Sequence, residues 1–315
     1  METMILNALA PVFFVMGLGY FAGRRRLVDN MNVANLNVLV MTFALPAALF
    51  TAISRTPQKV IIENGKLMLV LTLAMLVIFA VELLLQYRVF RTEPGKSAVQ
   101  TLTVALPNYA SVGLPLLGSV YGPESALSVA VAIAVGAVTV TPLTLVLLEN
   151  ASARDVSVSP VRRFLKATVK SLRRPIFWAP MLGVLVALSN VPLPDVVGHM
   201  LELIGRATAG AALFLTGVIL SAQRLRINLD VITGVLLKNV LQPLLAWGIV
   251  CLLVIPQPIA GQSILLIAIP AGFFGVVFGV GYGVRSEAAG ATLIASSIFS
   301  MFSLAVIIMR VAPRT

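Results

Sequence analysis

Charged residues are scarce in this chain. Only 11% of its 315 residues are Asp, Glu, Lys or Arg, and 59% are hydrophobic, whereas a soluble domain carries about 25% charged residues. The chain also has a single cysteine, Cys251, and a single histidine, His199. These counts exclude a disulfide framework and any metal centre built from several cysteines. The composition therefore predicts a multi-pass membrane protein.

Catalytic motifs are missing as well. The sequence has no HExxH, no Walker loop, no GxSxG and no pair of intramembrane aspartates. It therefore lacks the motifs that membrane proteases and ATP-driven pumps require. The formal charge of +11 does not indicate nucleic-acid binding, because the basic residues fill short gaps between apolar runs. We expect no enzymatic activity, no cofactor, no metal and no nucleic-acid partner.

Apolar runs of transmembrane length are what the chain does contain. A bilayer core of about 30 Å needs about 20 apolar residues per helix. Counting such runs predicts an all-α fold of ten transmembrane helices. They lie near residues 4–23, 33–53, 66–87, 98–119, 125–148, 175–190, 198–221, 231–254, 260–283 and 288–309.

Basic residues set the expected orientation and the division of the chain. Arg24, Arg25 and Arg26 follow the first apolar run and no Lys or Arg precedes it, which is the reverse of a signal peptide. Most of the 23 Lys and Arg residues lie in connections on the same side as these arginines, and cytoplasmic connections carry such an excess. We therefore expect both termini outside. The longest connection predicts repeats in 1–150 and 175–315 joined by a basic cytoplasmic linker, 151–174.

The fourth predicted helix is interrupted. It contains ALPNYASVGLPLLG, in which Pro107 and Pro115 lack an N–H and disfavour helix before them. Lipid cannot satisfy the freed carbonyls, so such a break survives against protein or in a cavity, where transporters bind substrates; one proline alone could also be a packing kink. The ninth helix has Pro270-Ala271-Gly272 at the equivalent place. Because each repeat has an odd number of helices, the second is expected to be inverted.

Leu106-Pro107-Asn108 followed by Gly113-Leu114-Pro115 closely resembles the fourth helix of the auxin efflux carrier family, which includes plant exporters and bacterial carriers of small organic anions. Other segments are similar to the family too: Ala10-Pro11-Val12-Phe13, Ala44-Leu45-Pro46-Ala47, Arg174-Pro175, Ala212-Leu213-Phe214-Leu215-Thr216-Gly217 and Lys238 with Gln242-Pro243. The ninth helix departs from the plant carriers because Phe273-Phe274-Gly275 follows Gly272 without a second proline. This departure argues against auxin-like specificity.

The resemblance implies an architecture and a location. Helices four and nine would cross at mid-membrane, as in the bile acid/sodium symporter-like and NhaA-like folds. Helices 1, 2, 6 and 7 would form a scaffold that dimerises, and helices 3–5 and 8–10 a transport domain that moves as an elevator. The location implied is the bacterial inner (cytoplasmic) membrane, with lipid and a small organic anion as partners.

Two polar residues are the sharpest substrate candidates. The Asn108 amide can bind a carboxylate or tie down a freed carbonyl, and the family uses the matching Asn for substrate. Arg206, inside the seventh helix, suits a second carboxylate, although a pair with Glu202 one turn earlier is the alternative. The complete predicted substrate site consists of Asn108, Arg206, Pro107, Ser111, Gly113, Pro115, Pro270, Ala271 and Gly272.

Lys238 and Glu82 are predicted at similar depth in helices eight and three. They are expected to form an ion pair inside the bundle or a coupling site that exchanges a proton.

These residues predict a secondary active transporter of a small organic anion. Among bacterial members, the absence of a long central loop and the mid-helix arginine resemble the malonate carriers, so malonate or a related dicarboxylate is the leading substrate. A monocarboxylate, amino-acid or auxin-like carrier is the alternative within the class, and a receptor or channel lies outside it. Neither the direction of transport nor the coupling ion follows from the sequence.

Overall fold

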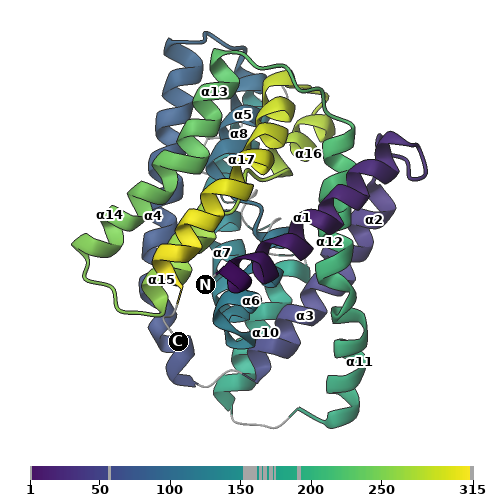
Figure 1. The fold of residues 1–315 in the computed structure, drawn as a ribbon, viewed down its shortest axis with the longest axis vertical. Helices are drawn as coiled ribbons and strands as arrows, with labels where there is room; N and C mark the ends of the chain where they lie inside the picture. The colour runs from purple at the N-terminus through teal and green to yellow at the C-terminus, as the bar shows by residue number, and fades with distance from the viewer. Residues whose placement is uncertain are drawn as a thin grey trace.

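The structure, a computed structural model, describes residues 2–55, 58–151, 175–189 and 193–312, and residues 162, 165, 169 and 173 between them. The described residues form helices and no strand (Figure 1). Most of the predicted linker, 151–174, lies outside the described residues.

The first half of the chain runs from α1 to α8. Its helices are α1 (Glu2–Arg24), α2 (Ala34–Val38), the π-helical η1 (Leu39–Ala44), α3 (Leu45–Ser54), α4 (Gln58–Arg88), α5 (Pro94–Ala105), the π-helical η2 (Tyr109–Gly113), α6 (Leu114–Tyr121), the 3₁₀ turn η3 (Pro123–Ser125), α7 (Ala126–Val138) and α8 (Val140–Ala151). The second half consists of α10 (Pro175–Ser189), α11 (Asp195–Gly205), α12 (Ala207–Ser221), α13 (Leu229–Leu236), the π-helical η4 (Leu237–Leu241), α14 (Gln242–Leu252), α15 (Ile259–Ala268), α16 (Phe274–Gly281) and α17 (Glu287–Val311).

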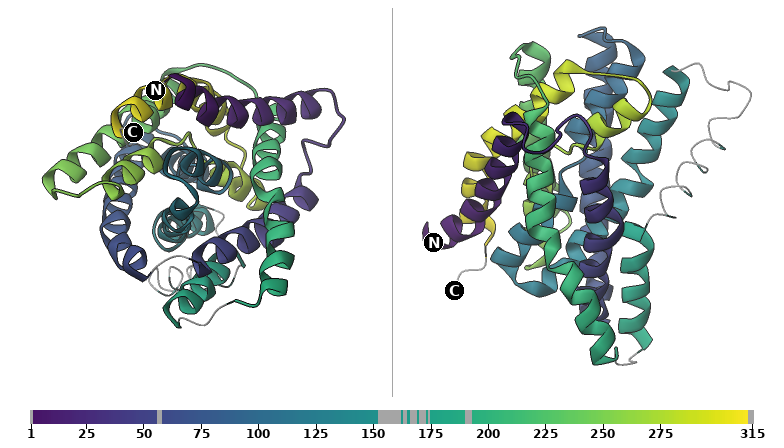
Figure 2. Two further views of the ribbon diagram at one scale, coloured as in Figure 1. Left: turned by 60° about the horizontal axis from the view of Figure 1, so that its bottom comes forward. Right: turned by 90° about the vertical axis from the view of Figure 1, so that its right-hand side faces the viewer.

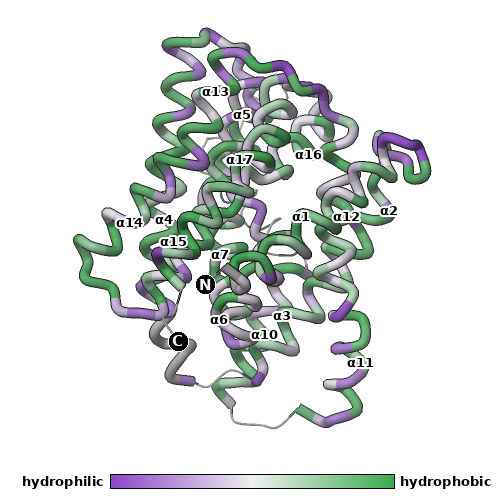
Figure 3. The backbone as a smooth tube through the Cα atoms, viewed as in Figure 1, coloured by the Kyte–Doolittle hydropathy of each residue, from purple (hydrophilic) through white to green (hydrophobic). Residues whose placement is uncertain are grey.

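Seven helical segments of the described chain are long and apolar enough to cross a membrane. They are Ile5–Arg24, Ala34–Ser54, Asn64–Arg88, Pro123–Ala151, Asp195–Ala222, Leu229–Leu252 and Glu287–Val311. Hydrophobic residues predominate along most of the helices (Figure 3). Many large apolar side chains are exposed, for example those of Phe14, Leu252 and Phe302. The chain is therefore a polytopic, all-helical membrane protein. The three other predicted spans are α5–α6 and α15–α16, both broken, and the 15-residue α10. The count of ten spans and the inverted repeat stay predictions.

Three of the helices contain a π-helical turn directly before a proline. Leu45-Pro46, Leu114-Pro115 and Gln242-Pro243 follow η1, η2 and η4. Proline has no N–H and its ring clashes with the carbonyl four residues back, so the wider turn relieves the clash at the cost of one extra residue. Each such turn rotates the rest of its helix by about 100° relative to a regular α-helix.

Glycines let α1 lie against α12 at close range. A Cβ on Gly19 would collide with the carbonyl of Phe214, and a Cβ on Gly217 with that of Met16. Small residues at such contacts let helix backbones approach, which stabilises helix pairs in lipid through packing. The centre of the molecule lies elsewhere: Figure 2 (left) shows the segment from α5 to α7 inside a ring of longer helices.

Candidate substrate site at the helix crossing

The two broken helices meet at their breaks. Pro107 and Ala271 form an isolated antiparallel bridge, and the Asn108 N–H donates to the Pro270 carbonyl at 2.9 Å. The two breaks are therefore in contact, and we refer to this contact as the crossing. It joins α5–η2–α6 to α15–α16, segments that are far apart in the sequence.

Proline chemistry explains where each break falls. Leu106 (φ −100°, ψ 109°) and Ile269 (φ −53°, ψ 140°) end their helices in extended conformations. Each directly precedes a proline, Pro107 or Pro270, whose ring disfavours helix in the residue before it. Gly272 then permits the close approach, since a Cβ there would collide with the carbonyl oxygen of Leu106.

Lys238 and Gln242 satisfy the carbonyls that the breaks leave free. The Gln242 side chain donates to the Ala105 carbonyl at 2.9 Å, at the end of α5. Lys238 Nζ donates to the Ile267 carbonyl at 2.8 Å, at the end of α15, and to Gln242 Oε1 at 2.6 Å. Both side chains are fully buried. Together they cap the last turns of both helices that lead into the crossing.

A second polar group supports the crossing from α17. Ser296 Oγ accepts from the Ala271 N–H at 2.9 Å and donates to Asn239 Oδ1 at 2.7 Å. The predicted site did not include Gln242, Asn239 or Ser296. The spacing of Lys238, Asn239 and Gln242 within one turn before a proline was the available signal.

Lys238 and Glu82 do not form the predicted ion pair in the structure, and the alternative of a proton-coupling role for them stays a prediction. Lys238 bonds to Gln242 and Ile267, as described above, while Glu82 Oε1 accepts from Gln86, which also donates to Asp230. The π-helical turn that contains Lys238 changes the direction in which this side chain points, so depth in the sequence did not predict its partner.

Asn108 lies at the crossing and faces α12. Its side chain is 1% exposed, and Nδ2 donates to Thr216 Oγ1 at 3.3 Å. The Thr216 hydroxyl in turn lies 2.9 Å from Ser111 Oγ. Asn108 Oδ1 is buried without a hydrogen-bond partner. A buried acceptor left unpaired costs about 1–3 kcal/mol, so this amide is not optimised for the packing around it.

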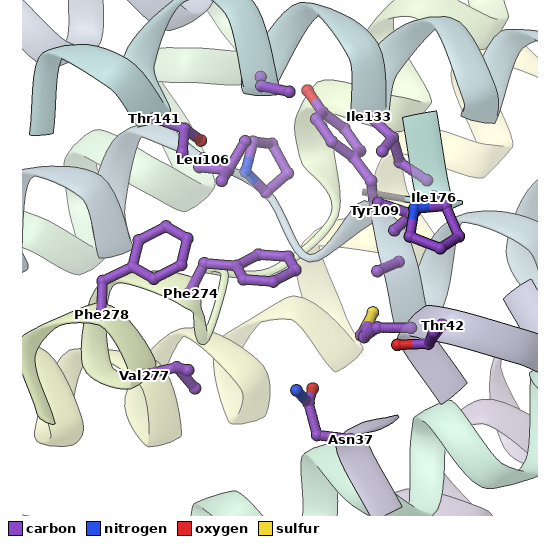
Figure 4. Close-up of a pocket in the computed structure, with 16 residues that line it drawn as sticks. Asn37, Thr42, Leu106, Tyr109, Ile133, Thr141, Ile176, Phe274, Val277 and Phe278 are labelled. Carbon is purple, nitrogen blue, oxygen red and sulfur yellow. The ribbon is translucent and has the colours of Figure 1, made fainter. Parts of the chain in front are cut away.

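A cavity of about 340 Å³ adjoins the crossing (Figure 4). None of its lining residues carries a charge. In the close-up, Asn37 and Val277 lie on the opposite side of the cavity from Tyr109 and Ile133, and the Phe274 ring projects between them. The lining residues are Asn37, Met41, Thr42, Leu106, Pro107, Tyr109, Ala110, Ile133, Gly136, Ala137, Thr141, Pro175, Ile176, Phe274, Val277 and Phe278.

The other predicted site residues divide into two groups. Pro107, Pro270, Ala271 and Gly272 form the crossing, and Ser111 lies beside Thr216. Gly113 instead packs against Val129, and Pro115 starts α6. Of the predicted residues, only Pro107 lines the cavity itself.

Arg206 is not part of this site. Its side chain is 77% exposed and pairs with Glu202 at 2.9 Å, and Glu202 also lies 3.9 Å from Arg55. Ten residues separate Arg206 from Thr216, a rise of about 15 Å along a helix. The structure thus shows the alternative, the i,i+4 pair, and the predicted second carboxylate anchor does not lie at the crossing.

Apolar spans surrounding two crossed, broken helices define a multi-pass membrane transporter. Residues 4–308 match the family described as Membrane transport protein, and the chain belongs to this family, the auxin efflux carriers. The predicted family is confirmed.

Curated relatives cover nearly the whole chain. An uncharacterised transporter of Escherichia coli strain K12, YfdV, is 29% identical over 94% of each chain. A putative malonate transporter of Rhizobium meliloti is 28% identical over 94% of this chain and 92% of its own length. Auxin efflux carrier component 8 of Arabidopsis thaliana is 23% identical over 90% of both. These relatives are named as transporters and carriers, in agreement with the expectation that the chain is not an enzyme.

Proposed function

We propose that this protein is a secondary active transporter that binds a small organic anion in the cavity beside the crossing. The observation that carries the proposal is the bridge between Pro107 and Ala271 next to a cavity of about 340 Å³, a volume at the lower end of the range for ligand pockets. The segment from Tyr109 to Tyr121 and helix α16 both begin at the crossing. Helix N-termini attract anions, and Asn108 adds an amide that can turn toward a carboxylate.

The lining of the cavity favours one carboxylate on an apolar body. Phe274, Phe278 and Ile133 provide apolar surface, and no Lys or Arg belongs to the lining. A monocarboxylate needs only the helix ends and Asn108. A second carboxylate would need a cation or several donors when desolvated.

Malonate or a related dicarboxylate is the second candidate. Its support is the putative malonate transporter that is 28% identical over most of both chains. For this candidate, the cavity lining offers neutral polar side chains to a second carboxylate, among them Asn37, Thr42 and Thr141.

The proposed mechanism is alternating access by an elevator stroke. Hydrogen bonds from Gln242, Lys238 and Ser296 join the crossing to α14, η4 and α17, which supports the predicted transport domain moving as one body. The scaffold would contain α1, α3, α10 and α12, and would form the homodimer. With basic connections on the cytoplasmic side, both termini lie outside in the inner membrane, and the cavity lies on the cytoplasmic side of the crossing.

Counterflow in proteoliposomes tests the function. Vesicles loaded with one of a panel of C2 to C5 mono- and dicarboxylates are diluted into trace labelled anion. Saturable, trans-stimulated uptake supports a carrier, and strongest exchange with a monocarboxylate supports the favoured substrate class. Preference for malonate selects the second candidate, whereas amino acids or an indole acid as best substrate would select the other predicted classes. Flux that rises linearly with the gradient would instead identify a channel, and binding without flux a receptor.

A further inference from the structure

Two adjoining cavities lie away from the crossing, where α1, α12 and α17 meet. Their volumes are about 640 and 620 Å³, and Arg24 and Arg224 line both. The first has mainly apolar walls, from Phe13, Met16, Gly17, Tyr20, Leu220, Gln223, Leu225, Ile294, Ser297, Ile298 and Met301. The second lies beside it and adds Arg26 together with residues of the connection that follows α1.

The arginines here are free to bind an anion. Arg24, Arg26 and Arg224 are exposed, and within the described residues none forms an ion pair. The nearby Asp29 uses its carboxylate on the N–H groups of Met31 and Asn32. Three arginines and one carboxylate, Asp29, line the second cavity. Because backbone N–H groups already bind that carboxylate, the excess of positive charge favours a ligand with negative charge.

The basic end is built into the fold. Arg26 has φ 58°, a left-handed conformation that glycine normally takes at a helix end and that costs other residues about 1 kcal/mol or more. Hydrogen bonds from Arg26 N to Gly23 O and from Leu27 N to Ala22 O close α1 around it. Asn30 then donates to Ser221 Oγ at 2.9 Å, which fastens this connection to α12.

The apolar part has the length of a lipid chain in one leaflet. From Phe13 to Arg24, α1 rises about 16 Å, and half of a bilayer core is about 15 Å. Ile298 and Met301 of α17 are about half exposed along this groove. A free phosphate or carboxylate would use only the arginines and leave these walls uncovered.

We propose that this groove binds one anionic phospholipid of the cytoplasmic leaflet. Its phosphate lies between Arg24 and Arg224, with Arg26 beside it, and an acyl chain follows Phe13, Met16 and Ile294 into the membrane. The inference is independent of which substrate the crossing carries.

Purified full-length protein in a non-ionic detergent tests the proposal. Dioleoyl phosphatidylglycerol should raise the melting temperature by several degrees and remain bound in native mass spectrometry, whereas dioleoyl phosphatidylcholine should do neither. Arg24→Gln combined with Arg224→Gln should weaken phosphatidylglycerol binding by about 30-fold, since each basic side chain near an anionic headgroup contributes about fivefold.

Arg25→Gln is the matched control. Arg25 has the same charge one residue further along, lines neither cavity and lies over the Phe21 ring. This variant should bind phosphatidylglycerol like the unchanged protein. Equal losses in Arg25→Gln and in the double variant would show general surface attraction and overturn the site.

Gly17→Leu tests the acyl chain separately. A Cβ on Gly17 meets nothing within 4 Å, so the leucine enters the groove without disturbing α1, and leucine is the better helix former. It should abolish retention of phosphatidylglycerol while the arginines stay in place. Stabilisation by inorganic phosphate alone, with Gly17→Leu silent, would identify a free-anion site and overturn the lipid assignment. Equal binding of both lipids would do the same.

Discussion

The surroundings of Asn108 satisfy only part of its buried side chain. Its Oδ1 has no partner although the side chain is 1% exposed. A purely structural role would favour a pair of satisfied groups or an apolar side chain. Thr216 accepts from the Asn108 Nδ2 group at 3.3 Å, and we infer that the amide also serves to bind substrate.

Replacing Asn108 with Ala should separate function from stability. Substrate affinity is expected to fall about tenfold or more, equivalent to about 1.4 kcal/mol, because one donor to the carboxylate is lost. The melting temperature should stay the same or rise, since an unpaired buried acceptor disappears with the side chain. Counterflow and thermal unfolding measure the two effects, and Asn35→Ala, on an exposed helix surface, is the control. A large loss of stability with unchanged affinity would mean that Asn108 only supports the fold.

Replacing Arg206, in contrast to Asn108, is expected to have little effect on substrate binding. Because it is exposed and paired with Glu202, Arg206→Gln should change substrate affinity by less than about twofold and stability by less than about 1 kcal/mol. Arg55→Gln, which removes the weaker neighbour of the same Glu202, should behave alike. Competition assays with malonate and a monocarboxylate provide the measurement. If Arg206→Gln lowered the affinity for malonate alone, Arg206 would have to be a substrate-binding residue after all.

At the scale of the helical elements, Gln242 links both halves of the crossing. It accepts from Lys238, which holds the end of α15, and donates to Ala105 at the end of α5. Gln242→Leu removes both bonds at once. The substitution leaves the Ala105 carbonyl and part of the Lys238 ammonium buried without hydrogen-bond partners. A buried ammonium that has lost a partner destabilises the fold more than an apolar side chain at the same position would.

A double-mutant cycle at these two positions checks this role. Gln242→Leu alone should lower the free energy of unfolding by about 3 kcal/mol. Adding Lys238→Met should recover part of that loss, because the unpaired ammonium is removed. Thermal unfolding in detergent of the four proteins gives the coupling. Additive losses would show that the two side chains act independently and would contradict the bridge.

The sequence predicted where the helices are broken better than it predicted which side chains bond to one another. Pro107 and Pro270 fix extended residues before them through local sterics, so both breaks could be predicted without tertiary information. Partners depend on which way a helix face points, and the π-helical turn that contains Lys238 changes that direction. Arg206 was misplaced because it lies between α11 and α12, an interruption that no proline or glycine-rich motif announced at that residue.

At the scale of the whole molecule, the proposed elevator stroke requires α17 to move past the end of α12. These two elements touch where a Cβ on Gly290 would lie 3.3 Å from the Cβ of Gln223, close to the separation of about 3.8 Å that a disulfide needs. Gly95 and Ala151 offer an equivalent pair, 3.6 Å apart, between α5 and α8, within the proposed transport domain. The chain therefore contains one pair across the proposed moving boundary and one pair inside a single body.

Disulfides at these two places decide whether the crossing moves relative to α12. In a Cys251→Ser background, which removes the single native thiol, Gln223→Cys with Gly290→Cys should oxidise readily and stop counterflow, and a reductant should restore it, because the lock prevents one of the two end states. Gly95→Cys with Ala151→Cys should oxidise to the same extent and leave counterflow within about twofold, since its two helices travel together. Gel mobility quantifies each disulfide. Complete oxidation across Gln223 and Gly290 with undiminished counterflow would mean that α12 and the crossing keep a fixed relation, and transport would then have to work by local gating around Phe274 instead.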